Sequence, residues 1–95
     1  MVKYIRGALL QGFEVDRDSS VPIYRQIETF LRRLILDGTL QSSRKLPSTR
    51  ELASELGVSR ITVKSVYEQL IAEGYLDART GSGTFVTKGL NLETA

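Results

Sequence analysis

The feature that most constrains the fold of this chain is a four-residue link, Leu56–Ser59, between two short segments that each begin with a helix-capping serine. Ser48 stands three residues before Glu51, which is the spacing of a capping box at a helix N-terminus. Gly57 can adopt the left-handed conformation that ends a helix. Ser59 can then cap a second helix almost immediately. We therefore predict two short helices that meet at a tight turn.

The apolar residues of the second helix define the face that it buries. They recur at three- and four-residue steps until Gly74, which ends the helix. A glycine-containing turn lets the second helix stand across the first, and this arrangement is the helix-turn-helix unit. The apolar residues are Val63, Val66, Tyr67, Leu70 and Ile71.

A longer helix is expected to precede this pair, from about Pro22 to Asp37. Either Ser19 or Ser20 can cap it. Pro22 suits its first turn and Gly38 ends it. Its apolar residues form one stripe that faces the core, made of Ile23, Ile27, Phe30, Leu31, Leu34 and Ile35.

Two strands are expected after the helices, at 75–79 and 84–87, joined by the glycine-rich turn Thr80–Gly83. Lys45–Pro47 can form only a very short extended piece, because the residue before a proline is disfavoured in the α region. The predicted fold class is therefore mainly α with a small β-hairpin, a winged helix-turn-helix of three helices plus a wing.

A chain of 95 residues fits one small domain with a single core. We expect residues 21–88 to form this domain. Residues 1–20 mix apolar positions with glycines and sustain no period, so no element is assigned there. Residues 89–95 are aperiodic and more polar, which indicates a tail or the start of a linker.

Composition excludes several classes of function. The chain has no Cys and no His, which rules out disulfides, thiolate or imidazole metal sites, and Ser-His or Cys-His catalytic pairs. Its eleven acidic residues are scattered singly on polar faces, where carboxylates are ordinarily solvated, so an acid/base pair is only formally open. No apolar run approaches the roughly 18 residues that span a bilayer, and the first 12 residues lack signal-peptide features. We expect a cytoplasmic protein that is not an enzyme.

The placement of charge, rather than the net charge, indicates a nucleic-acid partner. The formal net charge is only +2, which is too small to argue for any partner. The start of the last predicted helix nevertheless gathers hydroxyl and cationic groups that suit phosphates and guanine edges. The helix N-terminus adds the positive end of its dipole. The residues concerned are Ser59, Arg60, Thr62 and Lys64.

Ile61 is expected on the exposed face of the same helix. A projection at about 100° per residue places it beside Ser65, opposite the apolar stripe. An exposed apolar side chain near a helix N-terminus can contact a thymine methyl group in the major groove. The alternative is a singly exposed isoleucine without a role.

Two further positions each allow two interpretations. Arg50 lies in the first turn of a helix, where the dipole disfavours a cation, so it is expected either to pair with a carboxylate or to contact a phosphate or base. In the wing, Gly81 and Gly83 can simply satisfy turn dihedrals. Beside Arg79 and Thr80, they can also let the backbone approach a phosphate or the minor groove. The two interpretations of the wing are compatible.

Five sequence runs together resemble the GntR family of bacterial transcription regulators. The resemblance covers about Val21 to Val86 and is highly specific in this combination, although a helix-turn-helix pattern alone would be moderate evidence. The upstream run Asp16–Ile27 (DRDSSVPIYRQI) is most similar to the MocR subfamily. The five runs are Leu46–Arg60 (LPSTRELASELGVSR), Thr62–Val63, Tyr67–Leu70, Glu73–Leu76 and Gly81–Val86.

The resemblance implies sequence-specific binding of double-stranded DNA by a homodimer on an inverted or direct repeat. It brings the wing tip near Gly81 to a minor groove beside the major groove that the last helix enters. Ile61 departs from the polar residue common at its position, and Lys64 stands where arginine is frequent, so the base preference there is open. The side chains that the resemblance places on DNA are Arg50, Ser59, Arg60, Thr62 and Lys64.

MocR-type proteins carry a C-terminal domain similar to pyridoxal-phosphate aminotransferases, so the resemblance also implies that the complete protein continues into such a domain. Pyridoxal phosphate would bind there and not in this chain. The alternative function is a winged-helix module that binds proteins and has lost its DNA contacts. Arg50, Arg60 and Lys64 argue against that alternative, because such a module would more often show apolar or acidic residues on this face.

Overall fold

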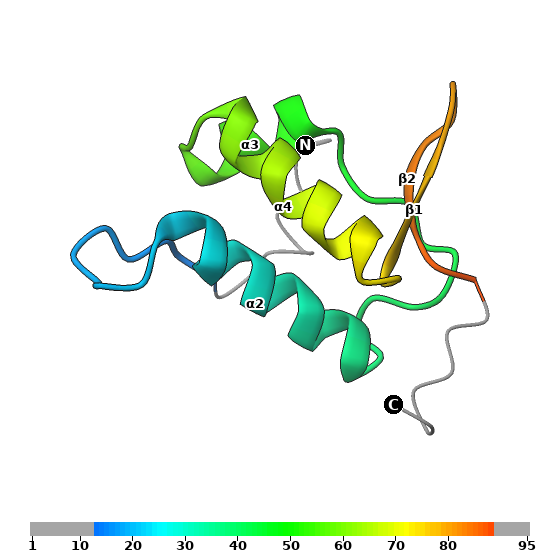
Figure 1. Cartoon of the computed structure of the whole chain (residues 1–95), viewed down its shortest axis with the longest axis horizontal. Coiled ribbons are helices and arrows are strands. Elements are labelled where there is room, and N and C mark those ends of the chain that lie inside the picture. Colours follow the sequence, from blue (N-terminus) through cyan, green and yellow to red (C-terminus); the bar gives the residue numbers. More distant parts are fainter. Residues whose placement is uncertain (1–12, 89–95) are drawn as a thin grey trace.

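The computed structural model describes residues 13–88, so the predictions for residues 1–12 and for the 89–95 tail lie outside the described residues. Within the described part, three helices and one antiparallel hairpin confirm the predicted fold class (Figure 1). The elements are α2 (Ile23–Leu36), α3 (Thr49–Leu56), α4 (Arg60–Ala72), β1 (Leu76–Arg79) and β2 (Gly83–Val86).

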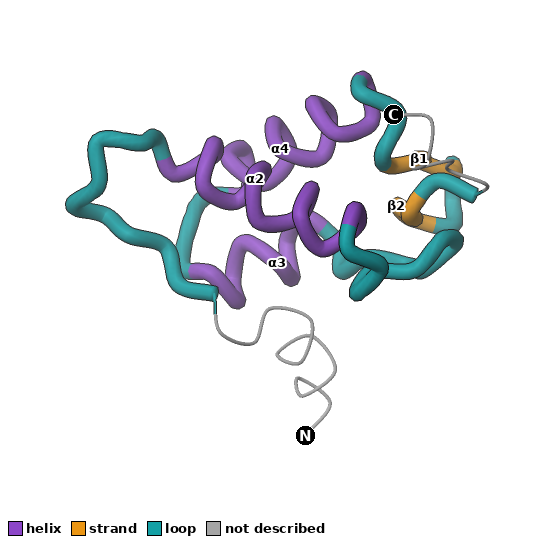
Figure 2. Tube along the Cα trace, turned by 90° about the horizontal axis from the view of Figure 1, so that it is seen from below, coloured by secondary structure: helices purple, strands orange, loops and turns teal. Residues whose placement is uncertain are grey.

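Helix α4 is the central element of the fold. It packs against both α2 and α3, and its C-terminal end leads into β1. Figure 1 shows α2 on one side of α4, with α3 and the free end of the hairpin on the other. Viewed from the α2 side (Figure 2), the loop before α2 and the hairpin lie at opposite ends of the helices. The start of α4, α3 and the hairpin tip therefore face away from α2.

The predicted helix caps around the turn are confirmed. The Ser48 hydroxyl accepts a hydrogen bond from the Glu51 amide (3.1 Å), and the Glu51 carboxylate accepts one from the Ser48 amide (3.0 Å). Gly57 has a φ of 70° and ends α3 in the left-handed conformation. The Ser59 hydroxyl accepts a bond from the Thr62 amide (3.2 Å) at the start of α4. The helix-turn-helix boundaries thus follow from short-range hydrogen bonds.

The start of α2 differs from the prediction that Ser19 or Ser20 caps it. Its N-cap residue is Pro22, and no side chain caps the helix, which begins at Ile23. The Ser19 hydroxyl instead accepts a hydrogen bond from the Val21 amide (3.0 Å). The serine is therefore engaged in the preceding turn, and a local bond has replaced the expected cap.

The segment before α2 is held against this helix by hydrogen bonds and a ring contact. The Gln26 side chain donates hydrogen bonds to the carbonyl oxygens of Asp16 (2.9 Å) and Val21 (2.8 Å) and accepts one from the Asp16 amide (2.8 Å). The Phe13 ring stacks on Phe30 with 4.3 Å between ring centroids. Part of the N-terminal segment, for which the sequence assigned no element, therefore packs on α2.

The hairpin is antiparallel, with Leu76 opposite Val86 at its base. The first strand, 76–79, is one residue shorter than the predicted 75–79. The second strand, 83–86, begins and ends one residue before the predicted 84–87. The predicted short extended piece lies along β2, where the Leu46 amide donates to the Thr84 carbonyl (2.8 Å) and the Val86 amide donates to the Arg44 carbonyl (2.8 Å). The connection before α3 is therefore part of the wing base.

The core lies between the three helices and the base of the hairpin. The predicted buried face of α4 is confirmed, with Ile71 partly buried at its edge. The Tyr67 hydroxyl donates a hydrogen bond to the Pro47 carbonyl (2.6 Å), and burial raises the pKa of Tyr67. The buried apolar residues are Ile27, Leu31, Ile35, Leu40, Leu46, Leu52, Ala53, Val63, Val66, Tyr67, Leu70, Leu76 and Val86.

No helix within residues 13–88 is long and apolar enough to cross a membrane.

Candidate nucleic-acid interface

The exposed face at the start of α4 carries the apolar and cationic side chains that the sequence placed there. Ile61 is 75% exposed, which confirms the predicted helix phase. Arg60 and Lys64 are also exposed. These three side chains, together with Thr49 from the start of α3, line an open hollow of about 260 Å³, here called the α3–α4 hollow. A small apolar surface is thus bordered by two cations and a threonine.

Ser59 and Thr62 lie at the same helix end but are engaged with each other. Their hydroxyl oxygens are 2.9 Å apart, and Ser59 also accepts the Thr62 amide bond that caps the helix. Whichever of the two donates in this pair, one hydroxyl hydrogen and at least one acceptor site on Thr62 stay open for a further partner. Their observed role is therefore to start α4 and to fix the end that carries the positive helix dipole.

Arg50 is exposed in the first turn of α3. The ion pairs between described residues involve Arg25, Arg32 and Arg79 and do not include Arg50. The same holds for Arg60 and Lys64 within residues 13–88. The carboxylate partner that was one of the two interpretations of Arg50 is thus not found in this part of the chain.

The wing turn has the backbone conformation that its glycines suggested. Gly81 has a φ of 78° and Gly83 a φ of 119°, values that residues other than glycine rarely adopt. Thr80 is exposed beside them. The Arg79 guanidinium lies over the Phe85 ring, 4.4 Å from its centroid, and Nε donates to the Asp77 carboxylate (3.4 Å). Arg79 therefore lies along the hairpin, and the tip presents mainly backbone and hydroxyl groups.

Sequence reasoning missed cations that come from distant parts of the chain. The Lys45 side chain lies across the wing turn, with its Cε 2.9 Å from the position that a Cβ on Gly83 would occupy. At the opposite end, the Arg17 guanidinium donates to the Gly57 carbonyl (2.6 Å) in the turn between α3 and α4. The positive charges of these residues were visible in the sequence. Their position was not, because it depends on contacts made about 40 residues away in the chain.

Comparison with known families identifies this arrangement. Residues 23–86 match the family described as bacterial regulatory proteins, gntR family. The probable rhizopine catabolism regulatory protein MocR of Rhizobium meliloti is 53% identical over 72 residues, which are 76% of this chain and 15% of that protein. The transcriptional repressor NagR of Bacillus subtilis is 43% identical over 74 residues, 78% of this chain and 30% of that protein. The chain thus spans less than a third of the length of either relative.

Solved structures share the fold. YtrA from Sulfolobus acidocaldarius, a GntR-family transcription factor, superposes with a TM-score of 0.74 at 39% identity, covering 83% of this chain and 66% of that one. The AraR DNA-binding domain in complex with operator ORE1 superposes with a TM-score of 0.68 at 31% identity, covering 80% of this chain and 95% of that one.

Proposed function

Because this chain belongs to the GntR family of bacterial regulatory proteins, we propose that residues 21–88 are the DNA-binding domain of a transcription regulator and bind a specific double-stranded operator. In this proposal α4 enters the major groove and the wing approaches the neighbouring minor groove. The observation that carries it is the α3–α4 hollow, where Arg60 and Lys64 border an exposed Ile61 and have no carboxylate partner within residues 13–88.

Each side chain at this surface has a proposed role. Arg50, Arg60 and Lys64 contact phosphates or base edges, because they are exposed cations at the starts of two helices. Ile61 contacts a thymine methyl group. Ser59 and Thr62 hold the start of α4, and the hydroxyl hydrogen that their mutual bond leaves over can be donated to a phosphate oxygen. Thr80 and Gly81 bring the wing backbone close to the sugar-phosphate chain.

The proposed partner is DNA rather than a protein, and the proposed activity is binding rather than catalysis. A protein-binding surface is typically depleted of charge at its centre, whereas this one gathers cations around the hollow. The operator-bound AraR domain, which has the same fold, supports the choice of DNA. We further propose that the complete regulator acts in the cytoplasm as a homodimer on two half-sites, so that this chain alone binds weakly.

A salt titration tests the proposal. A duplex selected by this chain from a random-sequence pool is titrated by fluorescence anisotropy at increasing salt. Each phosphate contact contributes a slope of about −0.9 in log K against log salt, so several contacts give a steep line. The double variant Arg60→Ala/Lys64→Ala should flatten the line. Arg25→Ala/Arg33→Ala, which removes two cations from α2, is the matched control and should leave it steep. A nearly flat line for the unmodified chain would reject DNA binding through this surface.

A further inference from the structure

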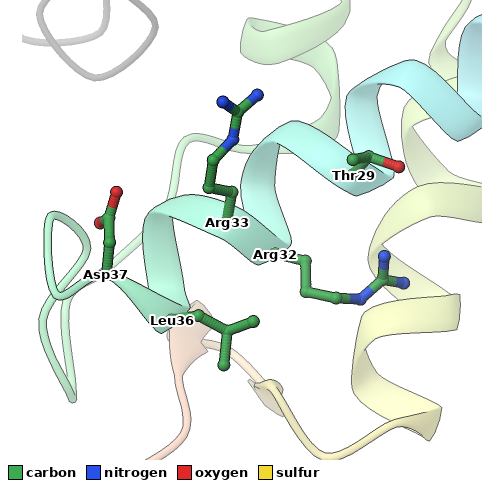
Figure 3. Close-up of a pocket in the computed structure, with 5 residues that line it drawn as sticks. All are labelled: Thr29, Arg32, Arg33, Leu36 and Asp37. Atoms are coloured by element: carbon green, nitrogen blue, oxygen red, sulfur yellow. The ribbon is translucent and has the colours of Figure 1, made fainter.

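Helix α2 carries two adjacent arginines that point in different directions. Figure 3 shows the Arg32 side chain directed toward the C-terminal part of α4, while the Arg33 side chain points away from it. Arg33 is exposed, whereas the Arg32 side chain is only 25% exposed. The two residues carry the same charge and lie on the same helix, so any difference between their roles comes from their surroundings.

The Arg32 guanidinium binds Glu73, the C-cap residue that directly follows α4, in a forked arrangement. Its Nε and Nη2 donate to Oε1 of Glu73 (3.1 and 2.9 Å), and Nη2 also lies 3.2 Å from Oε2. Nη2 donates in addition to the Glu28 carboxylate, which is buried on α2 (3.3 Å). Several parallel bonds of this kind fix direction as well as distance. Arg32 therefore restrains the orientation of Glu73 and does more than neutralise it.

Glu73 is placed unfavourably for helix stability, because a negative charge opposes the dipole at a helix C-terminus. Gln69 donates a hydrogen bond to its second oxygen (2.7 Å), which together with Arg32 holds the carboxylate in one position. Glu73 is followed by Gly74, whose φ is 89°, and then by the wing. A Cβ added at Gly74 would meet no heavy atom within 4 Å, so no side chain packs against this joint there, and the Gly74 amide donates to the Ile71 carbonyl (3.0 Å).

The residue on the other side of Gly74 faces the same guanidinium. The Arg32 guanidinium lies 5.8 Å from the centroid of the Tyr75 ring, within cation–π range. The Tyr75 amide donates to the Leu70 carbonyl (2.9 Å), and the Tyr75 carbonyl accepts from the Thr87 amide just after β2 (3.0 Å). Arg32 thus contacts both neighbours of the Gly74 joint, the C-cap residue of α4 and the residue just before β1.

We propose that Arg32 is a positioning residue that sets the angle of the wing relative to α4, so that the wing and the start of α4 can reach DNA together. This inference depends on the proposed function. Arg32 itself lies on α2 and does not line the α3–α4 hollow, so it acts through Glu73 and Tyr75. Holding the wing in place before binding removes an ordering cost that would otherwise weaken the complex.

The base of the wing has other attachments, so loss of Arg32 should leave the domain folded. Leu76 and Val86 are buried in the core, and the Ser43 amide donates to the Val86 carbonyl (2.9 Å). The variant Arg32→Gln removes the ion pair and the fork. Arg33→Gln is the matched control, because it removes the same charge from the neighbouring exposed position. Arg32→Lys keeps the charge without the fork and serves if the glutamine variant does not fold.

The experiment has one measurement without DNA and one with it. NMR order parameters of residues 80–83 in the free protein should fall in Arg32→Gln and remain unchanged in Arg33→Gln. In anisotropy titrations with the selected duplex, Arg32→Gln should weaken binding about three- to tenfold. In an Arg79→Ala/Thr80→Ala background, where the wing contributes less, the same substitution should change binding by less than about twofold.

The outcomes separate the two proposals. Equal weakening by Arg32→Gln with and without the wing substitutions would overturn the positioning role, and so would unchanged order parameters. If the unmodified chain does not bind the duplex while Arg32→Gln still loosens residues 80–83, the proposed function fails and Arg32 positions the wing for another partner. Equal losses in the Arg32 and Arg33 variants would reduce Arg32 to a long-range charge.

Discussion

The two ends of α4 place arginines in opposite surroundings. At the N-terminal end, Arg60 is exposed and has no carboxylate partner within residues 13–88. At the C-terminal end, Arg32 is enclosed by Glu28 and Glu73. A charge without an internal partner is available to an external anion, whereas a paired charge holds the fold in one arrangement. The proposed site of DNA contact and the proposed site of wing positioning thus lie at opposite ends of α4.

The largest expected effect concerns Tyr67, a buried residue of α4 that lies between the two helix ends compared above. Tyr67→Phe removes the hydroxyl that donates to the Pro47 carbonyl just before α3. A poorly solvated carbonyl that loses its partner costs about 1–3 kcal/mol, so the free energy of unfolding measured with urea should fall by that amount. Tyr24→Phe, on the exposed part of α2, is the control and should change stability by less than about 0.5 kcal/mol. Equal effects in both variants would show that the Tyr67 bond contributes nothing.

The next prediction tests the contact end directly. Arg60→Ala should leave the melting temperature nearly unchanged, because the Arg60 side chain is exposed and forms no ion pair with a carboxylate within residues 13–88. Binding to the selected duplex should weaken by about 1–3 kcal/mol if Arg60 contacts a guanine. If it contacts a phosphate, the salt slope should become shallower by about one unit. Arg25→Ala, on α2, should change neither the affinity for the selected duplex nor the salt slope. An Arg60 variant with normal binding would remove this residue from the interface.

Ile61→Ala should have a smaller effect on binding and almost none on stability. The side chain is 75% exposed, so the free energy of unfolding should change by no more than about 0.5 kcal/mol. Losing a contact with a thymine methyl group should cost roughly 1 kcal/mol at the selected site and relax the preference at one A·T pair. Binding to a scrambled duplex should not change. Melting curves and titrations against singly substituted duplexes give the answer, and unchanged base preference would leave Ile61 without a role.

The smallest expected effect is a pH dependence at the positioning end. The Gln69 hydrogen bond, followed by the Arg32 hydrogen bond and charge, lowers the pKa of Glu73 below its ordinary value. A carboxylate whose pKa is lower in the folded state stabilises the fold above its unfolded pKa and loses this contribution as the pH falls. The stability difference between the unmodified chain and Glu73→Gln should therefore be present at pH 7. It should shrink as the pH falls below about 4.

This pH effect should be small because the Glu73 side chain is about 30% exposed and solvent screens the pair. The Thr39 hydrogen bonds also lower the pKa of Asp37, but this contribution is common to both proteins and cancels in the difference. A stability difference that did not change between pH 7 and pH 3 would contradict a charged Glu73 as the partner of Arg32.

Residues close in sequence made the helix-turn-helix predictable. Ser48 and Glu51 are three residues apart, and Ser59 caps through the Thr62 amide, so both helix starts depend on bonds inside one turn of chain. The same local reasoning failed at α2, because the Ser19 hydroxyl had a competing partner at Val21. Where two local bonds compete, the sequence names the candidates and the tertiary structure selects between them.

The sequence alone determined which side of α4 is buried, since the spacing of its apolar residues places Ile61 opposite the buried stripe, where the structure leaves it exposed. It also placed Arg60 and Lys64 on the exposed side, while their contacts with DNA remain a prediction. Only the tertiary structure decided that Thr49 borders the α3–α4 hollow and that Arg32 reaches Glu73. The latter two residues are 41 positions apart. Periodicity determines the face of a helix on which a side chain lies, but the partner of that side chain depends on how the helices pack.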